Sequence, residues 1–192
     1  MIEIIPNYHP ILVHFTVALF STSLGFHVLN YLGAKTTRIQ PELTEEFATV
    51  GRWCLWACAI ATLLTITAGL HAYYTVGHDA VSHAAMTKHR NWAIPTAIAI
   101  WLIAIWSVLR HLKKKKISLV FVIALLIVQA LVLSTAWRGA ELVYRYGLGV
   151  MALPQAEEVG HQHENMTMHS MTNEDGTSMN MEEHDRSSDS HE

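Results

Sequence analysis

Histidine is the residue type in this sequence best suited to chemistry, because a neutral imidazole is the commonest metal ligand and an axial ligand for haem. The chain has 13 histidines among its 192 residues, and eight of them precede residue 154. Six of these eight lie at ends of long apolar segments that would meet on one side of a helical bundle, or in the connection between two such segments. They are His9, His14, His71, His78, His83 and His89.

Four long apolar segments must position these histidines. A helix needs roughly 20 residues to cross about 30 Å of hydrocarbon, and residues 10–32, 50–74, 92–109 and 117–135 approximately meet that length. The chain is 51% hydrophobic and only 15% charged, whereas a soluble domain carries about 25% charged residues. The sequence therefore predicts an all-α integral membrane protein, a four-transmembrane-helix bundle over residues 1–153 with a disordered C-terminal tail over 154–192.

Lysine and arginine predict the orientation of the bundle, because cytoplasmic loops carry an excess of both. Eight basic residues fall on one side of the predicted membrane and four on the other. The eight are Lys35, Arg38, Arg52, Arg110, Lys113, Lys114, Lys115 and Lys116. We therefore expect an inner (plasma) membrane protein with both termini outside the cytoplasm, in the periplasm if the source is Gram-negative. The histidine cluster would then face outward.

His14 lies one turn inside the first apolar segment, and Ala18, Ser21 and Gly25 share its helical face. Small residues let neighbouring helices pack closely, so we expect His14 to point into the bundle. One hypothesis makes His14 an axial haem ligand, with His71 or His89 from a neighbouring helix as the second. The alternative is a buried histidine bonded to a backbone carbonyl or a glutamate.

The remaining histidines of the cluster, His9, His78 and His83, are candidate metal ligands. Asp79 and Glu141 are carboxylates that can orient a ligating imidazole by hydrogen bonding. Glu141 also stands four residues before Arg145, a favourable helical pair. The alternative for His83 and His89 is an ordinary solvated loop, because residues 77–92 are polar throughout. The spacings match no compact zinc motif.

Two motifs at opposite ends of the body resemble those of a known family. The run from His9 to Phe15 (HPILVHF), followed by Ala18 and Leu19, resembles the opening motif of the predicted membrane proteins catalogued as domain of unknown function 2231. Residues 137–150 resemble its closing motif, and the resemblance covers roughly residues 5–151. It implies a four-span membrane body. This sequence has Tyr146 where the family pattern often has histidine, which argues against carrying over any ligand role that the family assigns to that position.

The acidic tail combines imidazoles with thioethers, a donor set that suits copper, with methionine favouring Cu(I). It holds ten of the 16 acidic residues and one of the 13 basic ones. Core packing cannot explain methionine in such a solvated segment, although biased composition in a disordered tail is the alternative. The candidate metal ligands are His161, His163, Met166, Met168, His169, Met171, Met179 and Met181.

Three functions remain open from sequence. The chain is a membrane protein that binds haem b or a transition metal for electron transfer, or a copper-binding protein that uses its tail, or a structural membrane subunit without cofactor. Haem or copper is the suspected cofactor, and the expected partners are the lipid bilayer and redox or metal-carrier proteins on the outer side. The chain has no Ser/His/Asp order, P-loop, glycine fingerprint or paired-cysteine zinc motif, which argues against a hydrolase or nucleotide-dependent enzyme. We expect no nucleic-acid partner.

Overall fold

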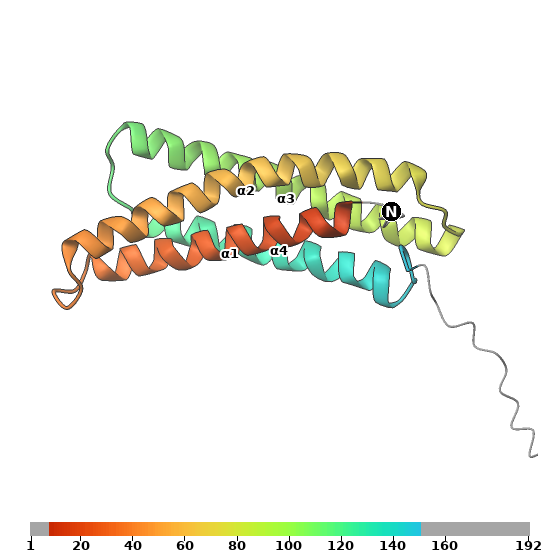
Figure 1. Cartoon of the computed structure of the whole chain (residues 1–192), viewed down its shortest axis with the longest axis horizontal. Coiled ribbons are helices and arrows are strands. Elements are labelled where there is room, and N and C mark those ends of the chain that lie inside the picture. Colours follow the sequence, from red (N-terminus) through yellow and green to blue (C-terminus); the bar gives the residue numbers. More distant parts are fainter. Residues whose placement is uncertain (1–7, 151–192) are drawn as a thin grey trace, which may run out of the picture. The chain divides into compact units, whose positions relative to one another are not determined.

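The computed structural model describes residues 8–150, and these form four long α-helices joined by short connections (Figure 1). The helices are α1 (His9–Gly33), α2 (Pro41–Thr75), α3 (Ala80–Leu112) and α4 (Leu119–Tyr144). The described residues contain no strand. The predicted all-α, four-helix fold is therefore confirmed.

Local sequence explains where these helices begin. A proline lies in the first turn of α1 and of α2, where its missing N–H costs no helical hydrogen bond. The side chains of Asp79 and Ser118 cap α3 and α4, accepting bonds from the backbone N–H groups of Ser82 and Phe121. Because of these start signals, α2 begins nine residues before the predicted span and α3 begins twelve residues before it.

The surface of the bundle is apolar, as expected for helices in lipid. Large aliphatic side chains in the middle of the helices are exposed, among them Ile60, Leu102 and Ile127, whereas Phe20, Leu55 and Leu125 fill the core. All four helices are long and apolar enough to cross a membrane. A monomeric soluble bundle does not leave such a continuous apolar surface uncovered, so the helices belong in a membrane.

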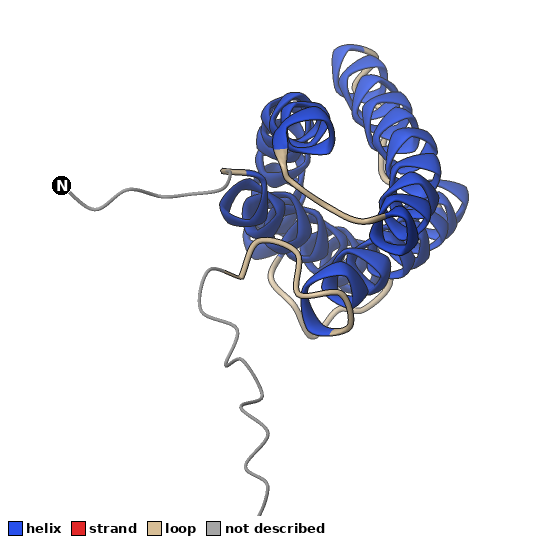
Figure 2. Ribbon diagram, turned by 90° about the vertical axis from the view of Figure 1, so that its right-hand side faces the viewer, coloured by secondary structure: helices blue, strands red, loops and turns tan. Residues whose placement is uncertain are grey.

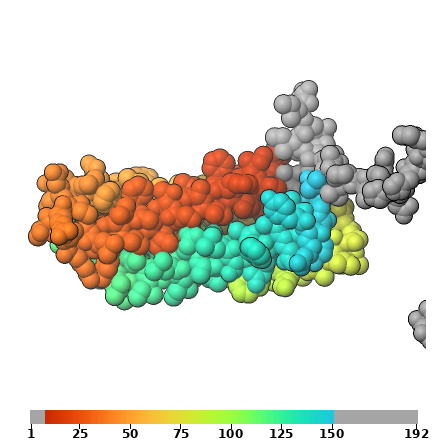
Figure 3. Space-filling view, turned by 90° about the horizontal axis from the view of Figure 1, so that it is seen from below, coloured from red at the N-terminus to blue at the C-terminus, as the bar shows by residue number. Residues whose placement is uncertain are grey.

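The helices form an up-and-down ring in which each packs against the next and α4 returns to α1 (Figures 1 and 2). Helices α1 and α4 lie side by side on one face (Figure 3). We call one end of the bundle the termini end, because Tyr8, residues 76–79 and residues 145–150 lie there. The other is the basic end, formed by the connections 34–40 and 113–118.

A ladder of polar contacts runs the full length of the α1–α2 interface. Four residues of α1, spaced seven apart, contact four residues of α2 that have the same spacing. Because the two helices are antiparallel, each step of seven residues forward along α1 corresponds to a step of seven residues back along α2. The rungs are His9 Nδ1 to Thr65 O (3.0 Å), Cys58 Sγ to Thr16 O (3.4 Å), Ser23 Oγ to Gly51 O (2.8 Å) and Asn30 Nδ2 to Thr44 O (2.7 Å). We call this set the α1–α2 ladder.

The ladder overturns the expected orientation of His14. Positions 9, 16, 23 and 30 lie along the side of α1 that faces α2, and Thr16 and Ser23 are buried. Successive residues turn by about 100°, so the face of His14, Ala18, Ser21 and Gly25 is rotated by roughly 150° from the ladder. Those four residues are exposed, and among residues 8–150 His14 bonds only the Pro10 carbonyl of its own helix. The small-residue face thus points away from α2, and its Ser21 bonds Gln129 of α4.

Glycine makes room for a histidine at the basic end of the ladder. His27 is buried on α1, with Nδ1 2.8 Å from the Ser23 carbonyl oxygen. A Cβ added to Gly51 would lie 2.8 Å from His27 Nδ1 and 2.9 Å from Cε1. No real Cβ tolerates these distances, so the α1–α2 spacing depends on glycine at position 51.

We predict that Gly51→Ala destabilises the protein by about 1–3 kcal/mol, the usual cost of overpacking a well-packed core. Gly25→Ala is the matched control, because that glycine is also helical on the neighbouring helix but has no atom within 4 Å of an added Cβ. It should leave stability unchanged or raise it by up to about 1 kcal/mol through helix propensity. Unfolding of both variants in detergent micelles measures the difference, and equal stability would contradict the close packing of His27 on Gly51.

Candidate metal centre

Two histidines from different helices come together near the termini end. His9 is the first residue of α1 and His89 lies in the third turn of α3. Both are half-buried, and their ring centroids are 6.3 Å apart with the ring planes at 72°. We call them the His9–His89 pair. The predicted cluster therefore contains one inward-facing pair.

Each ring of the pair rests on the backbone of another helix at a glycine. A Cβ added to Gly69 on α2 would lie 2.8 Å from His9 Cε1. A Cβ added to Gly139 on α4 would lie 3.2 Å from His89 Cε1. All four helices thus contribute to the site, two through imidazoles and two through glycines that let those imidazoles approach.

A hydrogen bond to a backbone carbonyl sets the tautomer of His9. His9 donates from Nδ1 to the Thr65 carbonyl oxygen, 3.0 Å away, so in the neutral ring Nε2 carries the lone pair. The His89 ring lies near the backbone of Thr135, and its Nδ1 is buried with no hydrogen-bond partner among the described residues. An imidazole whose second nitrogen donates to a carbonyl is oriented as metal-ligating histidines usually are.

His78 and His83 form a second pair that is satisfied internally. His78 Nδ1 donates to the Val76 carbonyl oxygen at 2.6 Å, and His78 Nε2 lies 2.8 Å from His83 Nδ1. The Tyr73 hydroxyl lies 3.3 Å from His83 Nε2 and 3.0 Å from Thr87 Oγ1. When both rings are neutral, each hydrogen bond in this chain can have one donor and one acceptor. A metal would have to break the chain to bind there.

The other candidates of the body are not brought to the His9–His89 pair. His14 and His71 are exposed. Asp79 caps α3, with Oδ1 accepting from the Ser82 N–H at 2.8 Å, and Glu141 pairs with Arg145 at 2.7 Å, as the spacing of four predicts. The candidates of the tail, from His161 to Met181, lie outside the described residues. Within residues 8–150, no group of three metal-binding side chains assembles.

Sequence reasoning missed three positions on which the pair depends, namely Thr65, Gly69 and Gly139. Thr65 carries a detectable signal, because Thr44, Gly51, Cys58 and Thr65 form a polar and small heptad on α2 that matches the one on α1. Gly69 lies one turn further along α2. Gly139 lies in the closing motif of residues 137–150, but nothing in that motif indicates a contact with His89.

Comparison with protein families decides the relationship of this chain. The model of a family of predicted membrane proteins, DUF2231, matches residues 6–152. This chain belongs to the DUF2231 family. The resemblance of the opening and closing motifs is thereby confirmed, and in this DUF2231 protein the opening motif contributes His9 and the closing motif contributes Gly139. Comparison with curated proteins and with solved structures gave no significant match.

The capping role of Asp79 leads to a prediction about pH. Hydrogen bonds from the side chain and the backbone N–H of Ser82 hold the pKa of the Asp79 carboxyl below its ordinary value of 3.8. A depressed folded-state pKa means that the cap stabilises α3 above the unfolded pKa, and that this contribution is lost as pH falls through the lower folded value. Asp79→Ala should therefore increase amide hydrogen exchange in the first turn of α3 at neutral pH.

Asp79→Asn is the matched control, because asparagine caps helices as well as aspartate does but does not titrate. Exchange in this variant should stay slow at neutral pH and should lack the acid-dependent increase of the native protein. Identical exchange in Asp79→Ala and the native protein would show that the cap contributes nothing.

Proposed function

We propose that this DUF2231 protein binds a transition-metal ion between His9 and His89, and that it takes part in metal handling or electron transfer at the membrane surface. The observation that carries the proposal is the His9–His89 pair itself. Two half-buried imidazoles come from helices far apart in sequence, and each rests on a glycine. The His9 ring is also bonded to a backbone carbonyl. Ionisable groups held inside a membrane bundle commonly mark function.

The spacing of the rings supports a single ion. Two metal–nitrogen bonds of about 2 Å each, added to the radii of two imidazoles, span nearly the observed separation of the ring centroids. Imidazole donors suit copper, zinc, iron and nickel. Water can complete the coordination of an ion held by two side chains. Copper is the ion we favour, because the tail of the same chain combines imidazoles with thioethers.

Haem b is the second candidate, because its axial positions require only the two imidazoles that the site offers. The packing favours the ion. A macrocycle needs an open slot on every side of the line joining its axial ligands. Here the rings of His9 and His89 lie directly against the backbones of α2 and α4 at Gly69 and Gly139.

We predict that His9→Ala and His89→Ala each remove bound metal from the purified protein, because one remaining imidazole cannot hold the ion. His14→Ala and His71→Ala are matched controls, since both remove an exposed histidine from the α1 and α2 segments near the same end and should keep the metal. Elemental analysis of protein from copper-supplemented cells gives the metal content, and circular dichroism checks folding. Metal retained by both pair variants would overturn the proposal. A visible haem spectrum lost in both would assign the pair to haem.

The same measurement separates the pair from the tail. Full-length protein with Met166, Met168, Met171, Met179 and Met181 replaced by leucine should keep the ion at the pair. Thioethers do not titrate, whereas imidazoles protonate near pH 6.5. The variant should therefore lose only the Cu(I) that the native protein still binds in acid through its methionines. Loss of all metal in this variant would place the site in the tail.

The orientation we propose puts the basic end in the cytoplasm and the His9–His89 pair on the outer side, where a periplasmic carrier or redox protein can reach it. Eight basic residues support the inside assignment of the basic end, against four at the termini end. Reporter fusions after Lys116 and after Val150 should report cytoplasm and exterior, respectively. The reverse pattern would place the metal on the cytoplasmic side.

A further inference from the structure

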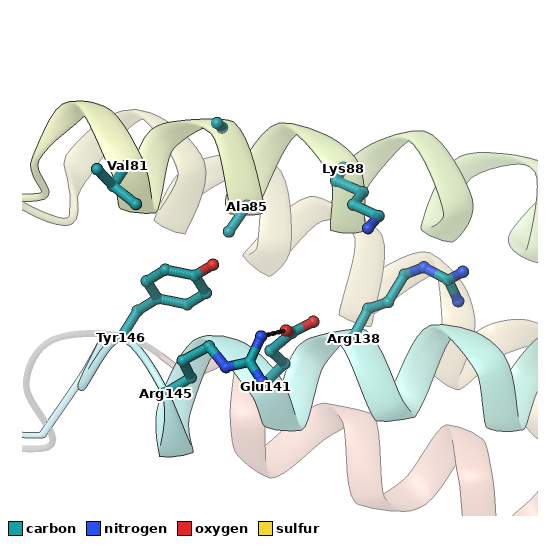
Figure 4. Close-up of a pocket in the computed structure, with 8 residues that line it drawn as sticks. Val81, Ala85, Lys88, Arg138, Glu141, Arg145 and Tyr146 are labelled. Atoms are coloured by element: carbon teal, nitrogen blue, oxygen red, sulfur yellow. Dashed lines mark hydrogen bonds and ion pairs between the residues drawn. The ribbon is translucent and has the colours of Figure 1, made fainter.

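A second site lies between α3 and α4 near the termini end, beside the proposed metal site, since Lys88 and Arg138 directly precede His89 and Gly139. It is a cavity of about 510 Å³, within the range of about 300–1,000 Å³ usual for ligand pockets. The α3 wall is made by Val81, Ala84, Ala85 and Lys88. Figure 4 shows Val81, Ala85 and Lys88 in a row along α3, with Tyr146 on the chain that follows α4. The alanines put only methyl groups on this wall, which leaves the space open.

The charge of the cavity is positive. Lys88, Arg138 and Arg145 line it together with one acid, Glu141. The Arg145–Glu141 contact at 2.7 Å is the only ion pair among residues 8–150. Because Glu141 already forms an ion pair with Arg145, the charges of Lys88 and Arg138 have no acidic partner among the described residues. An anion in the cavity would meet two uncompensated cations.

Contacts within the protein fix the position of the Arg138 side chain before an anion binds. Its guanidinium lies 3.9 Å from the centre of the Trp92 ring, and Nη1 donates to the Ser134 carbonyl oxygen at 2.8 Å. The Nε–H group is buried with no hydrogen-bond partner among the described residues. A guanidinium has five N–H donors in a fixed fork that matches phosphate, and the ring and the carbonyl fix its position before any ligand arrives.

The aromatic residues around the cavity indicate its depth in the membrane. Trp92 follows Lys88 by one turn on α3, while Trp137 and Tyr144 directly precede the two cavity arginines on α4. All three aromatic side chains are exposed. Exposed tryptophan and tyrosine concentrate at the boundary between lipid headgroups and acyl chains, so the cavity lies at the level of lipid phosphates.

We propose that this cavity binds a phosphate group, presented by the headgroup of an anionic phospholipid. Lys88 and Arg138 pair with the phosphate, and the apolar α3 wall contacts the glycerol and the first carbons of the acyl chains. Basic pockets between transmembrane helices on the cytoplasmic or matrix side bind anionic headgroups, and the same pairing of cations with phosphate applies to an anionic lipid of the outer leaflet. Inorganic phosphate offers the same anion without the apolar part, so the lipid fits the whole surface of the cavity and the free ion fits only its charged half.

The test is native mass spectrometry of the full-length protein, delipidated in a nonionic detergent and then titrated with phosphatidylglycerol or phosphatidylcholine. Phosphatidylglycerol should give the larger fraction of bound lipid. One base near the surface contributes about 1 kcal/mol, or about fivefold in affinity, so Lys88→Gln with Arg138→Gln should lower phosphatidylglycerol binding by roughly 25-fold. Lys113→Gln with Lys115→Gln removes the same charge at the basic end, outside the cavity. This control measures the general attraction of surface lysines for anionic lipid, and it should lower phosphatidylglycerol binding less than the cavity variant does.

A second variant keeps every charge. Ala84→Leu with Ala85→Leu fills the α3 wall and should also remove the bound lipid, which guards against loss of folding in the Arg138 variant. Phosphatidylglycerol bound equally well by both cavity variants and the native protein, or no preference over phosphatidylcholine in the native protein, would overturn the proposal. Inorganic phosphate that displaces the lipid and binds alone with the same dependence on Lys88 and Arg138 would identify the free ion as the source of the phosphate.

Discussion

The α1–α2 ladder is the interaction on which the rest of the bundle depends. A polar group in hydrocarbon that finds no partner costs several kcal/mol, and α1 carries a polar side chain at every seventh residue from His9 to Asn30. All four side chains bond α2: three do so within the ladder, and the Thr16 hydroxyl bonds Thr65 Oγ1 while its carbonyl accepts from Cys58. This match sets both the rotation of α1 and its register along α2. A seven-residue repeat also keeps its face in contact when two helices wrap left-handedly around each other.

The register of α1 along α2 determines the geometry of the candidate metal centre. Because His9 occupies the rung nearest the termini end, its ring is fixed against Gly69, one turn beyond Thr65. His89 reaches the same place from α3 through the contact with Gly139, while a bond between the Thr96 and Thr135 hydroxyls (2.9 Å) joins α3 to α4 nearby. The site is therefore built on helices whose mutual positions are determined by polar contacts, which is what holding two imidazoles around one ion requires.

The number of helices and their class follow from the sequence, because length and apolar composition identify spans without knowledge of packing. The sequence of α1 alone does not show which of its faces turns inward. His14, Ala18, Ser21 and Gly25 recur at the same helical spacings as the ladder residues, and only the polar repeat on α2 tells the two faces apart. The contact between His9 and His89 is harder still to predict from sequence. It depends on the register of two helix pairs and on two glycines that are 70 residues apart. Sequence reasoning therefore identified both histidines but did not predict that they contact each other.

The even spacing of the ladder has a consequence for how this chain tolerates changes in length. One residue inserted between Thr16 and Ser23 would turn the remainder of α1 by about 100°. That rotation would carry Ser23, His27 and Asn30 away from α2 and towards lipid, leaving three polar side chains to be solvated by hydrocarbon. Connections such as residues 34–40 carry no rung and can lengthen freely. Insertions and deletions in related chains should accordingly fall between helices, and within α1 or α2 only in steps of seven made in both.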